Sequence, residues 1–264
     1  STPVRTLFPY TTLFRSMADK NAIYKYRSGI MRSFEEYFYG GGLPETLLMK
    51  DKRSWISSLF NKIFFGDLVA RHQIRNDFAL KLMIRKLAET VKQPTSYNRI
   101  ANIVSTAGKK ISVDTVIDYI AYLRESWLIL PFENLSARLS ERESNKKYYF
   151  VDNGLLGLFL IDANTSLLEN IVAISLRKQY EDNVFFYNKN IEVDFVVPDD
   201  GLAIQVAYSL ADPTTEKRET DALMKFNAIM PMRQLIIITK DEEMVIEKDG
   251  TVINVLPVWK WLLR

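Results

Sequence analysis

Apolar residues recur at helical spacing through the first half of the chain. Apolar positions three and four residues apart predict amphipathic helices over residues 54–71, 78–91, 97–107 and 113–127. Ser112 is a good N-cap for the last of them. Strands are predicted over residues 127–135 and 147–151. Three helices, a tight turn and a two-stranded ribbon are typical of a winged helix-turn-helix, with residues 112–126 as its recognition helix.

From residue 150 onward, short apolar strands alternate with helices. The predicted strands are residues 183–188, 192–197, 202–210, 234–239, 244–247 and 252–255. Further helices are predicted over residues 155–160, 215–229 and 258–263, and another helix carries Glu169, with Thr165 or Ser166 as its N-cap. Asp249-Gly250 between the last two strands is a strong hairpin signal. We therefore predict an α/β (α+β) chain with a helical winged-helix domain over residues 46–150 and a mixed-sheet domain over residues 151–264.

The first 45 residues are expected to lie outside both domains. Residues 17–45 are predicted to be the remnant of a linker, because residues 18–32 are polar and weakly patterned. From Phe34 aromatic residues follow at helical spacing, and Gly40-Gly41-Gly42 and Pro44 must stop a helix or turn there. The stretch TLFPYTTLFRS looks like a translated sequencing-adapter oligonucleotide, so residues 1–16 are expected to be an artefact. A signal peptide explains this stretch poorly, since it lacks a small-residue cleavage pattern. On this expectation Met17 is not a true start and the natural protein extends further upstream.

The composition limits the classes of site that the chain can carry. It has 264 residues, of which 47% are hydrophobic, which is enough for real cores. Since no apolar run approaches the length of a membrane span, we expect a soluble, cytoplasmic protein with no membrane partner. The chain has no Cys and one His, which excludes disulfides and Cys/His zinc sites and leaves oxygen-ligated metals.

Positive charge is concentrated between residues 50 and 110. This stretch holds 13 Lys or Arg residues against 4 acidic ones, although the whole chain carries only +3. Such a block suits a polyanion, and the candidate nucleic-acid-binding residues are Arg71, Arg75, Arg85, Lys86, Lys109 and Lys110. Solvated helix faces are the alternative. The acidic residues Asp114, Asp118 and Glu125 on the recognition helix would face phosphates unfavourably, so a structural or protein-binding role stays open.

The stretch 167–210 carries the candidate chemistry. Its order is a helix with Glu169, a strand with Asp194 and a strand with Gln205-Val206-Ala207, and it resembles the core of the restriction-endonuclease-like (PD-(D/E)XK) fold. The resemblance implies carboxylates that hold Mg²⁺ and a Lys that positions the attacking water. Glu169, Asp194 and Gln205 are thus vestigial catalytic candidates, and Glu169 and Asp194 are candidate metal ligands. Ala207 stands in the lysine place, which predicts a scaffold that has lost cleavage.

Each acidic candidate also has a structural reading. Asp194 interrupts an apolar strand, so its carboxylate needs either a metal or a Lys or Arg partner. Glu192, two positions earlier, lies on the same strand face. Glu169 can instead charge the first turn of its helix, where the macrodipole favours acids. Lys217 or Lys225 would have to reach the site for a migrated catalytic arrangement.

The order GGGLPE, two basic helices, the winged helix, KKYYFVDNGLLG, LLEN, EVDFVV and QVAYSL resembles the C-terminal half of a large prokaryotic family of AAA-type ATPases. The resemblance covers residues 34–264. It implies that ATP and its Mg²⁺ belong to an upstream domain, since no G-x-x-x-x-G-K-[ST] occurs here. In this fragment we expect no cofactor beyond a candidate Mg²⁺ at Asp194.

Three functions stay open from the sequence. The first is a non-catalytic C-terminal module of an AAA-type ATPase that binds DNA, a partner protein or its own ATPase domain. The second is an active Mg²⁺-dependent DNA nuclease. The third is a protein-interaction or regulatory module without nucleic acid.

Overall fold

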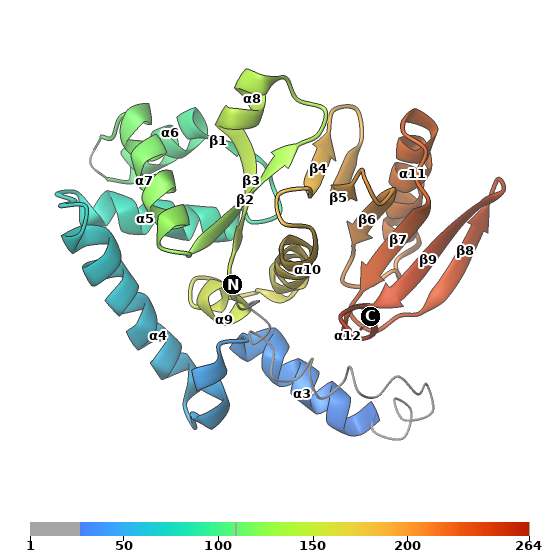
Figure 1. Cartoon of the computed structure of the whole chain (residues 1–264), viewed down its shortest axis with the longest axis horizontal. Coiled ribbons are helices and arrows are strands. Elements are labelled where there is room, and N and C mark those ends of the chain that lie inside the picture. The colour runs from blue at the N-terminus through green and yellow to red at the C-terminus, as the bar shows by residue number, and fades with distance from the viewer. Residues whose placement is uncertain (1–26, 109, 264) are drawn as a thin grey trace, which may run out of the picture.

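A single nine-stranded mixed sheet runs through the part of the chain that the structure describes (Figure 1). This structure is a computed structural model in which residues 27–108 and 110–263 are described, so the expected artefact at residues 1–16 and the candidate Lys109 lie outside them. The strand order is β1-β3-β2-β4-β5-β6-β7-β9-β8. The strands are β1 Thr95–Ser96, β2 Ile129–Asn134, β3 Asn145–Phe150, β4 Phe185–Asn188, β5 Glu192–Val197, β6 Leu202–Val206, β7 Gln234–Thr239, β8 Met244–Lys248 and β9 Thr251–Pro257.

The first half of the described chain is mainly helical, as its periodicity predicted. The helical elements are α3 Arg27–Gly40, η1 Pro44–Leu48, α4 Lys52–Lys62, η2 Ile63–Ala70, α5 Asp77–Glu89, α6 Tyr97–Ala107, α7 Val113–Glu125 and α8 Leu139–Ser144. Here η1 is a 3₁₀ helix and η2 is a π-helix that continues α4. Ser112 caps α7 as predicted, because its Oγ accepts a hydrogen bond from the Thr115 N–H at 3.1 Å.

The predicted linker is wrong where the structure describes it, because α3 is an integral part of the fold. Ile30, Phe34 and Phe38 on this helix are buried in the main core. The aromatic residues at helical spacing from Phe34 belong to this helix, which begins within the stretch 18–32 that is polar and weakly patterned. The glycines do end the helix, as expected: Gly41 has φ of 78°, the left-handed region that favours glycine.

The second half alternates strands with helices. Its helices are α9 Asn153–Gly157, α10 Asn164–Tyr180, α11 Pro213–Ile229 and α12 Val258–Trp261. The helix α10 starts before the predicted caps Thr165 and Ser166, and its N-cap residue is Ala163, which makes no side-chain capping bond. The Asp249-Gly250 hairpin is confirmed, since β8 and β9 pair antiparallel and both turn residues have positive φ.

The two predicted domains share one sheet and one core. The strand β2 of the first half pairs parallel with β4 of the second, with Glu133 opposite Phe185. One hydrophobic cluster extends from Ile30 to Trp261 and spans the predicted boundary at residue 150. A second cluster lies between α11 and the other face of the sheet. Helices therefore cover both faces of the sheet, with α10, α3 and α9 on one side and α11 on the other (Figure 1).

Among the described residues, no helix combines the length and the apolar character that crossing a lipid bilayer requires.

Candidate functional site

A lysine on β3 lies at the centre of the candidate site. Its ammonium group, Lys147 Nζ, is 3.3 Å from Glu169 Oε1, 3.2 Å from Glu192 Oε1 and 3.1 Å from Asp194 Oδ1. The Lys147 side chain is fully buried. We call these four residues the Lys147 cluster. Sheet pairing and helix packing bring them together, because Glu169 comes from α10 while Glu192 and Asp194 share one face of β5.

Hydrogen bonds from neighbouring groups fix the carboxylates of the cluster. The Tyr149 hydroxyl donates to Glu169 Oε1 at 2.7 Å. The backbone N–H of Val206 donates to Asp194 Oδ2 at 2.9 Å, so both oxygens of Asp194 are engaged. Tyr149 lies two residues after Lys147 and thus on the same face of β3. The strand that supplies the central cation therefore also orients one of its carboxylate partners.

Gln205 does not face the ammonium group but ties β6 to β5. Its Oε1 accepts a hydrogen bond from the Asp194 N–H at 2.9 Å, and its Nε2 donates to the Glu192 carbonyl at 3.0 Å. The amide thus binds backbone groups of both acidic residues on β5. A glutamate in this place would lack the donor for the Glu192 carbonyl.

Burial and charge shift the pKa values within the cluster. Burial on its own lowers the pKa of Lys147, but the charges of Glu169, Asp194 and Glu192 outweigh it, so this pKa lies above its ordinary value. Burial raises the pKa of Glu169 to about 8, although the Lys147 ammonium opposes the rise. Burial and the Glu169 charge raise the pKa of Tyr149, so its hydroxyl keeps the proton that it donates. Lys147 is therefore a permanent positive charge at neutral pH.

A fourth carboxylate, Glu219 on α11, lies in the same electrostatic field. Glu219 is buried and forms an ion pair with Arg218. Burial raises the pKa of Glu219, the bond from Arg218 opposes the rise, and the charges of Asp194 and Glu192 add to it. Glu219 thus extends the acidic side of the site toward α11.

The donor set of the cluster does not fit Mg²⁺ while Lys147 is in place. Mg²⁺ takes near-octahedral oxygen donors at about 2.0–2.1 Å. Each carboxylate instead has an oxygen on the Lys147 ammonium, and the second oxygen of Asp194 is bound to Val206. The described part of the chain holds no group of three or more His, Cys, Asp or Glu side chains placed to hold a metal ion. We assign no metal-dependent step to these residues.

The structure brings the predicted acids together but supplies a cation that the sequence analysis missed. The candidate lysines Lys217 and Lys225 are exposed on α11, and neither forms an ion pair with Asp194. Glu169 is not in the first turn of α10, which removes the helix-dipole reading of this residue. Asp194 has the structural partner that a carboxylate in an apolar strand requires, and that partner is Lys147. The available signal was the placement of Lys147 and Tyr149 two positions apart, on one face of the predicted strand 147–151.

The candidate nucleic-acid-binding residues form two groups. Arg71 pairs with Asp67 at 2.8 Å and Lys86 pairs with Glu89 at 3.1 Å, so part of their charge is neutralised. Arg75, Arg85 and Lys110 are exposed and form no ion pair with other described residues. The second group offers the charge that would be free for a polyanion.

Two family matches together cover most of the described chain. Residues 31–167 match the domain of unknown function DUF8612, and residues 164–261 match the domain of unknown function DUF4143. The boundary between the matches falls near the start of α10 rather than at residue 150.

Two curated relatives resemble the chain over most of its length. An uncharacterised protein of Methanocaldococcus jannaschii is 29% identical over 255 residues, which cover 90% of this chain and 57% of the relative. An uncharacterised protein of Haemophilus influenzae is 30% identical over 240 residues, which cover 88% of this chain and 58% of the relative. The chain thus spans somewhat more than half the length of these relatives. No solved structure matches it.

Proposed function

The chain belongs to the family of the domain of unknown function DUF8612, and from the geometry of its site we propose that it is a non-catalytic binding module. In this proposal a winged helix precedes a degenerate restriction-endonuclease-like domain, and the two act as the C-terminal part of an AAA-type ATPase. The order of the sequence motifs from GGGLPE to QVAYSL supports the ATPase context. The match to DUF4143 is consistent with a second unit that follows the first.

The order of elements supports a nuclease-derived scaffold. α10, the antiparallel strands β4, β5 and β6, the crossover helix α11 and the parallel strand β7 follow one another, with helices on both faces of the sheet. This is the arrangement that the resemblance to PD-(D/E)XK nucleases implies. Helices α5, α6 and α7 followed by the antiparallel pair β2 and β3 support the winged helix.

The ammonium group of Lys147 at the centre of three carboxylates is the observation that carries the non-catalytic assignment. A permanent cation already balances the acidic residues that a nuclease would use to hold Mg²⁺. Ala207, directly after β6, stands in the place where the nuclease motif has its lysine, so that place holds no cation. A scaffold in this state keeps its shape and its surface but has no group free to activate water.

Plasmid cleavage tests this assignment. We expect no nicking of supercoiled DNA by the native chain with Mg²⁺ or Mn²⁺. The control is Asp194→Ala, which should behave like the native chain in this assay although it is less stable. Cleavage by the native chain that Asp194→Ala abolishes would overturn the proposal.

The binding function rests on the exposed basic residues of the first half. Exposed Arg75 and Arg85 release counterions if they contact phosphates, so binding to duplex DNA should weaken steeply as salt rises. The double variant Arg75→Ala/Arg85→Ala should lower affinity at low salt and reduce the salt slope. If the native chain shows no affinity for DNA at low salt, the partner is a protein and the nucleic-acid half of the proposal is wrong.

An active nuclease is the second candidate, and one observation favours it. β3 places a lysine beside Asp194, so a cation stands near the acid even though Ala207 supplies none. In that reading Lys147 would steady the charge that develops on the phosphate. The variant Lys147→Met discriminates, because it abolishes cleavage in the active reading and has no cleavage to abolish in ours.

A further inference from the structure

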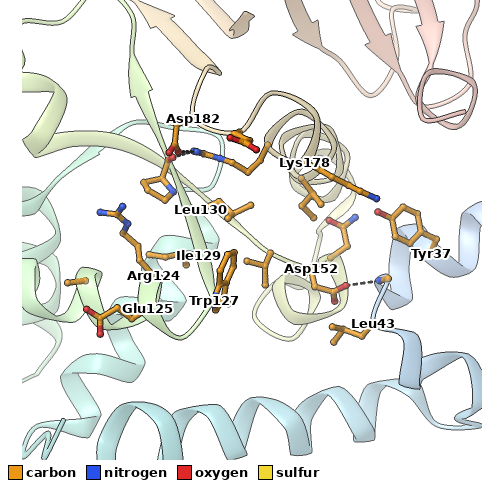
Figure 2. A pocket seen from close by; sticks show the side chains of 18 residues that line it. Tyr37, Leu43, Arg124, Glu125, Trp127, Ile129, Leu130, Asp152, Lys178 and Asp182 are labelled. Atoms are coloured by element: carbon orange, nitrogen blue, oxygen red, sulfur yellow. Dashed lines mark hydrogen bonds and ion pairs between the residues drawn. The ribbon is translucent and has the colours of Figure 1, made fainter. Parts of the chain in front are cut away.

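A pocket of about 780 Å³ lies between the C-terminal ends of α7 and α10. Arg124 and Trp127 line it at the end of α7, and Arg177, Lys178 and Asp182 line it at the end of α10. Figure 2 shows the side chains of Arg124, Trp127, Lys178 and Asp182 around the pocket. No residue of the Lys147 cluster and none of the candidate nucleic-acid-binding residues lines it. The pocket is therefore separate from the sites considered above.

Trp127 occupies a backbone position that favours glycine. Its φ is 53°, in the left-handed region. It follows the end of α7 as the C′ residue of a Schellman motif, with Leu128 N–H bonded to the Leu123 carbonyl and Trp127 N–H bonded to the Arg124 carbonyl, both at 3.0 Å. A bulky residue is strained in this conformation. The indole is also 75% exposed, so burial does not offset the strain.

Two guanidinium groups that line the pocket with Trp127 can donate further hydrogen bonds. Arg124 is exposed and forms no ion pair with any described residue. Arg177 donates through its terminal nitrogens to Asp182 and to the Pro131 carbonyl, but its Nε is buried without a partner in the described structure. Burial, with Arg124 nearby, lowers the pKa of Arg177, which an added anion would reverse.

The acidic groups that line the pocket do not cancel this capacity. Asp182 is paired with Arg177. The buried Asp152 carboxylate accepts hydrogen bonds from the backbone N–H groups of Gly42, Gly154 and Leu155. The remaining acids, Glu125 and Glu181, are exposed to solvent. Within the described ranges, the pocket thus places an Arg124 guanidinium without an ion pair and an Arg177 Nε without a partner beside an exposed aromatic ring.

We propose that this pocket binds a nucleotide unit, with the base stacked on Trp127 and the phosphate held by Arg124 and the Nε of Arg177. Base stacking on an aromatic side chain tolerates any base, and arginine is suited to phosphate. The unit can come from a free mononucleotide or from single-stranded nucleic acid. This inference does not rest on the basic surface around Arg75 and Arg85, because it uses different residues.

Tryptophan fluorescence of the full chain tests the proposal. Of the four tryptophans, Trp259 and Trp261 are buried and Trp55 is partly buried, so quenching by a ligand reports mainly on Trp127. The two ligands are thymidine monophosphate and a short oligothymidylate with a terminal phosphate, each at low salt. We expect saturable quenching by the oligothymidylate. Quenching by the mononucleotide as well would show that one unit suffices.

The variant Trp127→Gly separates binding from structure. Glycine relieves the strained backbone, so the unfolding midpoint should rise by roughly 2–4 °C, while affinity measured by anisotropy of a labelled oligothymidylate should fall roughly 10-fold or more. Arg124→Ala should weaken binding without stabilising the chain. The matched control is Gln73→Gly, at an exposed position with φ of 51° outside the pocket, which should stabilise the chain and leave affinity unchanged.

Two results would overturn the proposal. One is the absence of saturable quenching by either ligand at low salt. The other is a Trp127→Gly variant that binds the oligothymidylate as tightly as the native chain. Arg85→Ala keeps the two proposals apart, because it weakens duplex binding by the basic surface and should leave the quenching of Trp127 intact.

Discussion

Lys147 Nζ and Asp194 Oδ1 lie 3.1 Å apart, although 47 positions separate the two residues along the chain. The contact joins β3 to β5 across β2 and β4, so it forms only when the two halves of the sheet have assembled. Because Lys147 is completely buried, its charge depends entirely on these carboxylates for compensation. The electrostatic centre of the site and the junction between the two halves are thus the same group of residues.

The variant Lys147→Met should be strongly destabilised at neutral pH. Methionine nearly matches the volume of lysine but leaves the Asp194 carboxylate without its buried cation. Removal of one partner from a buried ion pair costs about 3–5 kcal/mol, which urea unfolding at pH 7 would measure. The loss should shrink at acid pH, where the carboxylates become protonated.

The matched control for this variant is Lys248→Met. Lys248 pairs with Asp221 at 2.8 Å, but both side chains are partly exposed. Solvent screens an exposed pair, which therefore contributes little to stability, so this variant should unfold nearly as the native chain does. Equal losses for the two variants would show that the Lys147 cluster contributes no more than an ordinary surface pair.

The variant Glu169→Gln should change how stability depends on pH. Burial raises the pKa of Glu169 from 4.5 to about 8 in the folded chain. The folded state then binds this proton more tightly than the unfolded state, so stability falls as the pH rises from about 4.5 to about 8. Glutamine can accept the Tyr149 hydrogen bond and does not titrate.

Urea midpoints at pH 5 and pH 8 provide the measurement. Between these two pH values the native midpoint should fall by more than that of Glu169→Gln. If both midpoints fall equally, Glu169 does not carry a raised pKa and its carboxylate is ionised in the folded chain at neutral pH.

Much of the fold follows from local patterns in the sequence. Helical spacing of apolar residues placed α5, α6, α7 and α11, because each buries one apolar side against the core. Asp249-Gly250 placed the last hairpin, since both turn residues need positive φ. For these elements the information lies within a few residues. Glu169 and Asp194, which the resemblance placed in one site, both contact Lys147.

The parts that sequence reasoning missed depend on contacts between distant segments. The sequence predicted a metal or an unspecified Lys or Arg as the partner of Asp194. That partner comes from β3, and no local pattern reveals that β2 lies parallel to β4. The helix α3 was taken for a linker because residues 18–32 are polar and weakly patterned, and its packing partners α9 and α10 lie far along the chain. Lys240, which follows β7, contacts residues of α3, and no spacing in the sequence predicts this contact.

The variant Lys240→Met should loosen α3. Lys240 Nζ is buried over the aromatic rings of α3, at 4.1 Å from the Phe38 centroid and 4.6 Å from that of Phe34, and it forms an ion pair with Glu35. Methionine keeps the apolar stem but removes the charge, which should cost about 2–3 kcal/mol for a desolvated cation–π contact and its ion pair. Hydrogen exchange of the α3 amides would accelerate.

The half-exposed Lys260, which pairs with Glu243, is the control for Lys240. Lys260→Met should leave exchange in α3 unchanged. If Lys240→Met also leaves it unchanged, apolar packing alone holds the helix and the cation adds nothing.

The variant Gly41→Ala should be destabilised by a direct collision. A Cβ at Gly41 would lie 2.1 Å from Asp152 Oδ1, and φ of 78° disfavours any residue with a side chain. Asp152 caps α9 and also accepts the Gly42 N–H at 2.6 Å, so its displacement would break several hydrogen bonds. The backbone strain and the lost cap should together cost at least about 2 kcal/mol, seen as a lower thermal midpoint.

Gly29 provides the opposite outcome within the same helix region. Nothing lies within 4 Å of a Cβ built at Gly29, which is inside α3 with no unusual φ. Gly29→Ala should therefore stabilise the chain by up to about 1 kcal/mol, because alanine favours the helix. The opposite signs follow from the contact between the end of α3 and the start of α9. If both variants shift the midpoint in the same direction, Asp152 does not lie against Gly41 and Gly42 as the structure shows.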